Sequence, residues 1–534
     1  MTAPLTMPAL LEARRYDSFG RELLVADEVR LTYDALDTRS VQFACELLGA
    51  GVGFGMRIGI MLPNTAEFVV TFAAITRIGA VAVPISTLST AVELRRICRH
   101  ANLHLLVSTP TYLHHSFTDR IGLAIGANDE LRPPYRLTEV PTLRHVWMWG
   151  DAAPVWATPI APGGPFDVAS ELVASVGAEV TPADTMAIVY TSGSTADPKG
   201  VIHTHGSMLR ASANCCLIYQ YQEGERCFTQ MPFFWVGGLT VNLLAIMLAR
   251  ATQLTSASSS SAELLDLLER ERATYVMAWP HLARAIAADP TFDDRDLSCV
   301  RLGSLYEALA PERRPADPSL MNSGLGMTET AGPHTAASMT ELPEHRRGSF
   351  GPAVAGMEHR IIDPETGVDL AHQEVGEVHV RGDTLMAGLV RRERQEVFDP
   401  DGWYRTGDLV SRRNGHLHFL GRLDDMIKTS GANVSPREVE SVLLGIPGVV
   451  AAIVTAIDDT GAGAIVGAAV VRADPALDAE AIRAVVKREL SAYKVPRVIV
   501  TLEPQEVPLM SSGKVDRRTI VGMLHQQRRQ EEAR

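Results

Sequence analysis

The first 110 residues alternate between short apolar runs and amphipathic stretches, and no other feature narrows the possible folds as much. Residues 56–62 and 80–84 are apolar enough for buried strands, and residues 66–78 between them have the pattern of a helix. Leu103 to Ser108 supplies a further strand. Strand–helix–strand units separated by short Gly and Pro breaks predict a parallel sheet with helices on its faces, so the expected fold class is α/β.

The end of the chain follows a different pattern. Two strand-like runs, 449–457 and 464–471, and one helical pattern, 478–490, predict a small α+β domain. We therefore expect two domains, residues 1–423 and residues 424–534. Part of the second domain is locally basic, and a basic face attached to a large acidic domain can close over a phosphorylated ligand.

Composition excludes several classes of function. The 534 residues include 63 acidic and 50 basic side chains, a net charge of −13, which argues against nucleic acid as the main partner. The six cysteines form no C-x-x-C pair and fit a reducing compartment. The N-terminus lacks the pattern of a signal peptide, and the apolar stretch Leu239–Ala249 has about half of the length that a membrane span needs. We expect a cytoplasmic protein without a membrane span.

Some local patterns carry no function in this interpretation. The four prolines between Asp151 and Phe166 predict a surface connector. The glycines of residues 49–55 and 461–467 do not match a dinucleotide fingerprint, and the second group predicts a hairpin turn. His203 and His205 alternate as on a strand, but no Cys or carboxylate cluster accompanies them, so we predict no metal site there.

The most informative stretch is residues 190–200, YTSGSTADPKG, which follows a strand-like run. Its glycine lets backbone N–H groups approach an anion closely, its four hydroxyls add donors, and its lysine adds a cation. It is not a Walker loop, because the lysine precedes the final glycine. We predict a phosphate-binding loop whose nucleotide-binding residues are Thr191, Ser192, Gly193, Ser194, Thr195 and Lys199.

Five further strings follow in order: GMTET at 326–330, GEVHVRG at 376–382, GWYRTGDL at 402–409, GRLDDMIKTSGANVSPREVE at 421–440 and PLMSSGKVDRR at 508–518. Together with the first string they resemble the motifs of the adenylate-forming superfamily, which includes acyl-CoA synthetases, peptide-synthetase adenylation domains and firefly-type luciferases. The resemblance covers about residue 30 to residue 520. It implies a large N-terminal adenylating domain of helix-covered sheets and a small C-terminal domain that swings about a hinge.

The resemblance also implies roles for individual residues. They are an α-phosphate contact for Thr328, Mg²⁺ binding for Glu329, ribose binding for Asp408, nucleotide binding for Arg422 and Lys428, a hinge at Asp424, a tunnel for the CoA thiol along Ser430, Gly431, Ala432 and Asn433, and catalysis by Lys514.

The implied reaction explains why such residues are needed. A carboxylate cannot form a thioester at neutral pH because its leaving group would be oxide, and adenylation turns that oxide into AMP. The attack brings a carboxylate onto an α-phosphate that is already negative, so the site must supply cations where charge accumulates. Lys199, Lys514, Arg422 and a Mg²⁺ ion on Glu329 would supply them. We therefore expect ATP, Mg²⁺ and CoA as cofactors and co-substrates.

Residues 231–239, MPFFWVGGL, align with the segment that lines the acyl pocket in the superfamily. Amino-acid-activating relatives carry an aspartate there, and a buried ammonium without such a partner is costly. We expect Trp235 to gate the acyl channel, the alternative being a plain core residue, and Gly237 and Gly238 to leave space beside it. The sequence favours a fatty, cyclic or aromatic acid and does not choose among them.

The chain also departs from the family pattern. Ala196 stands where a glycine is usual, and Leu325 replaces an aromatic residue that commonly stacks on adenine. Residues 305–309, LYEAL, replace a G-G-A-P-L stretch that flanks adenine. A lost stack costs about 0.5–1.5 kcal/mol, so ATP can still bind. We hypothesise that Tyr306 supplies the missing ring.

Several functions are compatible with these motifs. We favour an acyl-CoA ligase, and the alternative acceptor is the phosphopantetheine of an acyl carrier protein. No obvious insertion precedes the hinge of the kind that restricts domain swing in carrier-loading relatives, which favours free CoA. Nothing supports a luciferase-like oxidase. Retention of all the charged motif residues argues against a non-catalytic acyl or nucleotide sensor.

Overall fold

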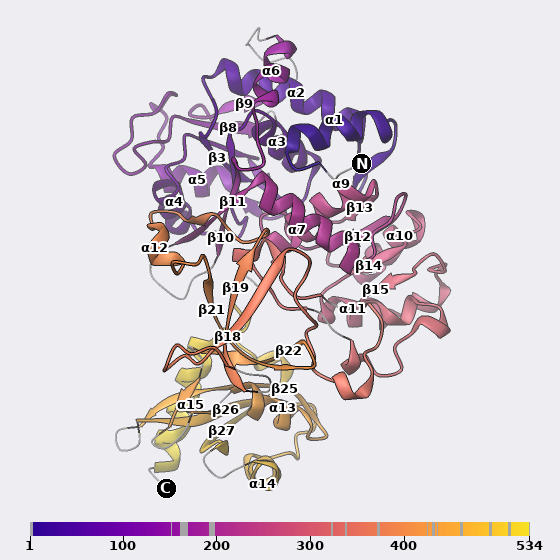
Figure 1. Cartoon of the computed structure of the whole chain (residues 1–534), viewed down its shortest axis with the longest axis vertical. Coiled ribbons are helices and arrows are strands. Elements are labelled where there is room, and N and C mark those ends of the chain that lie inside the picture. Colours follow the sequence, from indigo (N-terminus) through magenta and orange to yellow (C-terminus); the bar gives the residue numbers. More distant parts are fainter. Residues whose placement is uncertain are drawn as a thin grey trace. The chain divides into compact units, whose positions relative to one another are not determined.

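The structure is a computed structural model of the chain (Figure 1). It describes residues 4–150, 152–160, 169–191, 198–321, 324–336, 339–370, 374–423, 426–429, 433–434, 436–459, 463–490, 494–510 and 514–532. The chain forms two compact units, unit 1 with Met1–Glu358 and Val380–Tyr404, and unit 2 with His359–His379 and Arg405–Arg534. The division expected between residues 423 and 424 stays a prediction.

The larger sheet of unit 1 has eight strands. Their order is β20 (Gly388–Leu389), β11 (Lys199–Thr204), β10 (Thr185–Thr191), β4 (Val81–Pro84), β3 (Arg57–Met61), β5 (Leu105–Ser108), β8 (His145–Trp149) and β9 (Thr158–Ile160). The strands from β10 to β9 pair in parallel, and β11 and β20 add an antiparallel edge. The strands and the parallel sheet that the sequence predicts are confirmed.

Helices cover both faces of this sheet, as the alternation of its side chains requires. Ile58 and Ile60 of β3 share a hydrophobic cluster with α2 (Tyr33–Gly49) and α3 (Ala66–Arg77). Neighbouring strand residues that face the other way pack against α4 (Ala91–His100) and α5 (Phe117–Ile125). The helix predicted over residues 66–78 is therefore confirmed as α3.

The second sheet of unit 1 has six strands. Their order is β15 (Leu302–Gly303), β14 (Tyr275–Met277), β12 (Arg226–Thr229), β13 (Thr252–Thr255), β1 (Glu22–Ala26) and β2 (Val29–Thr32). One face packs on α10 (Ser261–Arg270) and α11 (Pro280–Ala287). The other face shares one hydrophobic core with α2 and α3. The same layer of helices also includes α7 (His205–Ile218) and α9 (Ala245–Ala249), and it packs against both sheets (Figure 1).

The predicted connector between Asp151 and Phe166 is wrong in part. Residues 158–160 form β9, which pairs in parallel with β8 at the edge of the sheet. A proline lacks only the N–H donor, and an edge strand leaves one side of the backbone unpaired, so Pro159 is tolerated there. The rest of the segment includes residue 151 and residues 161–166, which lie outside the described residues.

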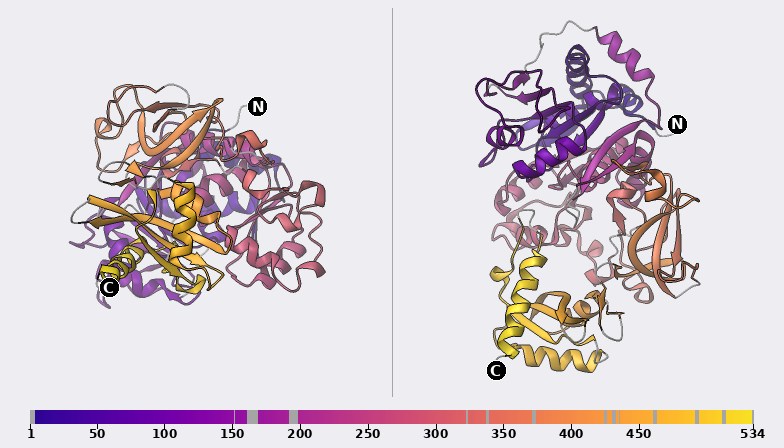
Figure 2. Two further views of the ribbon diagram at one scale, coloured as in Figure 1. Left: turned by 90° about the horizontal axis from the view of Figure 1, so that it is seen from below. Right: turned by 90° about the vertical axis from the view of Figure 1, so that its left-hand side faces the viewer.

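Unit 2 holds most of a four-stranded sheet in the order β18 (Met357–Ile362), β19 (Val375–Gly382), β21 (Tyr404–Arg413) and β22 (His416–Arg422). Its second sheet consists of β25 (Val449–Asp459), β26 (Gly463–Arg472) and β27 (Val498–Leu502). One face of that sheet packs on α13 (Pro436–Leu444) and α14 (Ala479–Glu489), and the other on α15 (Arg517–Glu532) (Figure 2).

The small α+β domain is thus confirmed. The predicted turn over residues 461–467 is shorter than expected, because β26 already begins at Gly463, where it pairs with Asp459. Residues 460–462, between the two strands, lie outside the described residues.

Apart from single-turn 3-10 helices, the remaining described helices and strands are short or peripheral. They are α1 (Met7–Asp17), β6 (Thr111–Tyr112), β7 (His115–Ser116), α6 (Ser170–Ala178), α8 (Val236–Gly238), the π-helix η1 (Leu239–Leu244), β16 (Gly326–Met327), β17 (Gly332–Pro333), α12 (Arg394–Val397), β23 (Ile427–Lys428) and β24 (Asn433–Val434). Across the described ranges, every helix is too short or too polar to cross a membrane.

Candidate active site

The two ends of the predicted phosphate-binding string lie on adjacent antiparallel strands of unit 1. Thr191 ends β10, Lys199 begins β11, and the two residues pair directly across the antiparallel ladder. The ladder therefore places both residues at the base of the loop that joins the strands. The candidate residues Ser192, Gly193, Ser194 and Thr195 belong to the segment 192–197, which lies outside the described residues.

Lys199, at the start of β11, contacts Glu329. The Lys199 ammonium forms an ion pair with Glu329 Oε1 and donates a hydrogen bond to the Tyr404 hydroxyl at 3.1 Å. Tyr404 in turn donates to Glu329 Oε1 at 3.3 Å. Burial by itself would lower the pKa of Lys199, but the neighbouring carboxylate outweighs it and raises that pKa, so the lysine is charged.

Three residues that are far apart in the sequence thus form one polar cluster. Burial and the Glu329 carboxylate both raise the pKa of Tyr404, so its hydroxyl keeps its proton. Tyr404 is not among the predicted site residues, although it stands inside the GWYRTGDL string. Only its contacts distinguish it from the other residues of that string.

The backbone around Thr328 and Glu329 is held from two sides. His203, fully buried in β11, donates its Nε2–H to the Thr328 carbonyl at 2.7 Å. The Met386 N–H donates to the Glu329 carbonyl, also at 2.7 Å. Two hydrogen bonds therefore hold the turn that carries the two predicted residues, and the buried His203 is a contact that the sequence analysis did not identify.

Acidification is expected to lower the free energy of unfolding through protonation of His203 and His205. Burial lowers the pKa of each imidazole to about 4, against an unfolded value near 6.5, so the unfolded state binds protons first. Their stabilising contribution is complete above pH 6.5 and is lost as the pH falls toward 4. His203→Gln keeps an N–H donor but does not titrate, so the slope of unfolding free energy against pH should fall by about 1.4 kcal/mol per pH unit within that range. Denaturant unfolding at a series of pH values measures this slope, and an unchanged slope would contradict the assignment.

The predicted ribose-binding residue lies in unit 2. Asp408 in β21 pairs across the ladder with Arg422 in β22, and Arg422 Nη1 donates to Asp408 Oδ1 at 2.8 Å. The two predicted nucleotide-binding residues are therefore adjacent, and each partly neutralises the other. The Thr406 hydroxyl accepts the Asp408 N–H at 3.0 Å and fixes the turn before it.

A buried carboxylate organises this turn. Glu377, 2% exposed, accepts hydrogen bonds from the Gly407 N–H at 2.9 Å, from Arg405 at 3.0 Å and from His379 at 3.2 Å. Burial by itself would raise the pKa of Glu377, but these donors outweigh it and lower that pKa to about 2. Glu377 stands in the GEVHVRG string, yet sequence reasoning assigned it no role.

The other predicted residues of unit 2 are described only in part. Lys514 is exposed, and its carbonyl accepts the Met510 N–H at 2.7 Å, which closes the loop before α15. Lys428 and Asn433 pair across the short β23–β24 ladder. The predicted hinge residue Asp424 and the tunnel residues Ser430, Gly431 and Ala432 lie outside the described residues.

The predicted acyl segment follows β12 in unit 1. Phe234 is buried and its ring meets the half-buried Trp235 edge to face, with the centroids 5.1 Å apart. Among the described residues, a Cβ added to Gly237 would have only Met231 Sδ within 4 Å, at 3.5 Å, so these residues leave room at Gly237. The space expected at Gly238 is wrong, because a Cβ there would lie 2.1 Å from the Pro232 carbonyl oxygen. Gly238 is needed for close backbone packing.

Residues 305–309, which replace the stretch that flanks adenine in the superfamily, belong to a hydrophobic cluster of the six-stranded sheet. Leu305 and Leu309 are buried in that cluster, and the half-buried Tyr306 packs against it. Leu325 donates its N–H to the Thr335 hydroxyl at 2.6 Å. The hypothesis that Tyr306 stacks on adenine stays a prediction.

Glu329 has the chemistry that Mg²⁺ prefers, a hard anionic oxygen on a turn whose backbone is held by two hydrogen bonds. Among the described side chains no group of three His, Cys, Asp or Glu could hold a metal by itself. Because Mg²⁺ commonly binds one or two carboxylates together with substrate phosphates, a single Glu329 carboxylate next to Lys199, at the end of the predicted phosphate-binding string, fits this ion.

Family models agree with the motifs. The model described as "AMP-binding enzyme" matches residues 12–390, and the model "AMP-binding enzyme C-terminal domain" matches residues 438–514. The chain belongs to this family of adenylate-forming enzymes. It is an acid–thiol ligase that works through an acyl adenylate, with ATP and CoA as substrates.

Individual relatives are distant but extend over nearly the whole chain. A feruloyl-CoA synthase of an Amycolatopsis species is 30% identical over 492 residues, 91% of this chain and 92% of that protein. A long-chain-fatty-acid–CoA ligase of Mycobacterium tuberculosis is 28% identical over 495 residues, with the same two shares. The crystal structure of an anthranilate CoA ligase with anthranoyl-AMP has the same fold, with a TM-score of 0.76, 23% identity and 98% of each chain covered.

Proposed function

We propose that the chain activates a fatty or bulky apolar carboxylic acid with ATP and Mg²⁺, releases pyrophosphate, and transfers the acyl group to CoA to give acyl-CoA and AMP. The observation that carries the substrate class is the acyl segment, where Phe234 and Trp235 stand and no acidic residue follows before η1 ends. An amino acid would bring an ammonium group without a partner. Relatives that are named for feruloyl and long-chain fatty acyl groups support the same class.

In this proposal each polar cluster has one task. Lys199 and the loop N–H groups bind the phosphates, and Asp408 with Arg422 binds the ribose hydroxyls. Mg²⁺ on Glu329 would neutralise phosphate charge when the nucleotide is bound. Lys199 would then exchange its contact with Glu329 for one with a phosphate, while Tyr404 keeps a proton to donate. Lys514 would bridge the substrate carboxylate and the α-phosphate as negative charge accumulates.

The proposed acceptor is free CoA, and an acyl carrier protein is the alternative. The predicted hinge at Asp424 has no obvious preceding insertion, which supports a swing that admits CoA to a tunnel beside Ser430 to Asn433. A cytoplasmic location, where ATP and CoA are available, is consistent with six cysteines that all remain free thiols.

Pyrophosphate release measured with ATP and a panel of carboxylic acids, with and without CoA, tests the proposal. We expect release with long-chain and aromatic acids and none with amino acids. Thioester formation with CoA, and none with a carrier protein, would support the acceptor. Release with no acid of the panel would contradict the proposed function.

Replacement of Trp235 by alanine should alter the ranking of acids in this assay. Trp235 is only half-buried, so we expect the ratio of kcat/KM between a bulky and a small acid to change by about 10-fold. The KM for ATP should stay within about 2-fold, because the nucleotide is bound by other residues. A core role predicts the opposite result, a large fall in melting temperature and an unchanged ranking.

A further inference from the structure

Residues 230–235, which include the first part of the acyl segment, have no regular secondary structure. Strand β12 ends at Thr229 and helix α8 begins at Val236. The backbone polar groups of a segment between two elements must find partners elsewhere, since an unpaired buried group is costly. The position of Trp235 therefore depends on which side chains bind this backbone.

Asn64 binds it on the N-terminal side. This residue lies in the loop between β3 and α3, at the end of the eight-stranded sheet, whereas the acyl segment follows a strand of the six-stranded sheet. Asn64 Nδ2 donates to the Met231 carbonyl at 2.9 Å, and the Phe233 N–H donates to Asn64 Oδ1 at 2.8 Å. One side-chain amide thus forms hydrogen bonds to the residues on both sides of Pro232. It links the end of the eight-stranded sheet to the segment that follows a strand of the six-stranded sheet.

Asn242 binds the segment on the C-terminal side. It lies in the π-helix η1, is 1% exposed, and donates from Nδ2 to the Gly237 carbonyl at 2.6 Å. Its Oδ1 accepts a hydrogen bond from the Tyr221 hydroxyl at 3.2 Å, which fixes the orientation of the amide. The backbone is consequently held on both sides of Trp235, two residues before it by Asn64 and two residues after it by Asn242.

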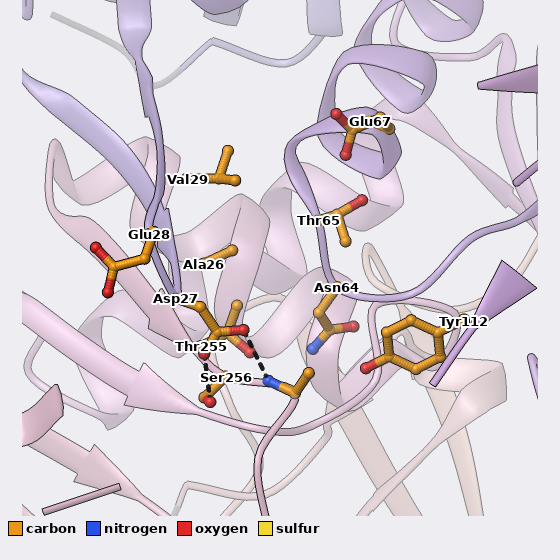
Figure 3. Close-up of a pocket in the computed structure, with 11 residues that line it drawn as sticks. Ala26, Asp27, Glu28, Val29, Asn64, Thr65, Glu67, Tyr112, Thr255 and Ser256 are labelled. Atoms are coloured by element: carbon orange, nitrogen blue, oxygen red, sulfur yellow. Dashed lines mark hydrogen bonds between the residues drawn. The ribbon is translucent and has the colours of Figure 1, made fainter. Parts of the chain in front are cut away.

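The two asparagines differ in what surrounds them. Asn64 is half-buried and lines a cavity of about 320 Å³ together with Asp27, Thr65 and Ser256 (Figure 3). Its side chain therefore borders open space on one side, and replacing it removes two hydrogen bonds without emptying a packed core. Asn242 is enclosed, so its replacement affects folding more strongly.

We infer that Asn64 and Asn242 are positioning residues for the acyl pocket, which hold the Trp235 segment in one conformation and thereby determine which carboxylic acids are accepted. This inference rests on the proposed function, because it assumes that Trp235 borders the acyl group. Loss of the hydrogen bonds from either asparagine lets the segment adopt other backbone conformations. The preference among acids then changes, whereas nucleotide binding does not.

The test compares Asn64→Leu, Asn64→Ala and Asn242→Ala with the unaltered protein in the pyrophosphate assay. For each Asn64 variant we expect the kcat/KM ratio between a long-chain and an aromatic acid to change by about 10-fold, with the KM for ATP within about 2-fold. Two substitutions at Asn64 keep the inference testable if one of them, or Asn242→Ala, does not fold.

Asn128→Ala is the matched control. Asn128 also binds backbone through its side chain, accepting the N–H groups of Glu130 at 3.1 Å and Leu131 at 2.9 Å, but in an exposed loop after α5. It should lower the melting temperature slightly and leave the ranking of acids unchanged. If folded Asn64 variants lose melting temperature and keep the ranking, the inference is overturned. If the unaltered protein activates no acid, the proposed function fails instead.

Discussion

Replacement of Lys514 by alanine is expected to slow acyl-adenylate formation by about 10²–10³-fold and to leave transfer of the acyl group to CoA largely intact. The first step places a carboxylate against an α-phosphate, so the loss of one cation that bridges them costs about 3–4 kcal/mol in the transition state. In the proposed reaction the swing carries Lys514 away before the thiol attacks, and the second step does not use it.

Two assays separate these steps. Pyrophosphate release reports adenylation, and thioester formation from synthetic acyl adenylate and CoA reports the second step alone. Arg518→Ala, which removes a cation four residues further along the chain in α15, is the control, and we expect both of its rates to stay within a few-fold. If Lys514→Ala keeps full adenylation, or if both steps fail together in a folded protein, the role of Lys514 is wrong.

The second large effect is expected at Glu377. Its carboxyl pKa is about 2 in the folded protein, against an ordinary value of 4.5, and the side chain is almost fully buried. The difference corresponds to roughly 3 kcal/mol of stability, which is present above pH 4.5 and is lost as the pH falls toward 2. Glu377→Gln should therefore lower the free energy of unfolding at pH 7 by about that amount.

Glu377→Gln should also raise the KM for ATP, because the carboxylate fixes the Gly407 N–H next to Asp408. Chemical denaturation and initial rates measure the two effects on one preparation. Glu358→Gln is the matched control, since Glu358 pairs with Arg381 at the surface, with both side chains more than a third exposed, and should cost less than 1 kcal/mol. A similar small loss for both variants would show that Glu377 does not organise the turn.

Much of the fold could be predicted because the local pattern of apolar and polar residues indicates where strands and helices form. Apolar periodicity predicts the buried strands at 56–62 and 80–84 and the helix between them. Because the connections are short, the two strands are expected to be parallel neighbours in one sheet. The small C-terminal domain follows for the same reason. Strand β9 was missed because three residues that include a proline have no periodicity of their own, and only pairing with β8 makes them a strand.

The motif residues are also a property of the sequence. Ordered strings place Lys199, Glu329, Asp408 and Lys514 in an adenylate-forming enzyme before any coordinates are known. The contact partners of these residues, however, cannot be predicted from the sequence. The free space predicted at Gly238 shows this limit, because the Pro232 carbonyl that fills it comes from a close backbone approach.

The class of fold, the family and the residue types proposed to perform the chemistry can all be predicted from the sequence, since they depend on local periodicity and on short ordered strings. Three contacts could not be predicted in this way and are seen only in the folded chain: Lys199 pairs with Glu329, His203 binds the Thr328 carbonyl and Asn64 binds the Met231 carbonyl. Each of these pairs joins positions more than a hundred residues apart. Hydrogen bonds and ion pairs act over a few ångströms, so such partners are chosen by the packing of two sheets around a shared helical layer.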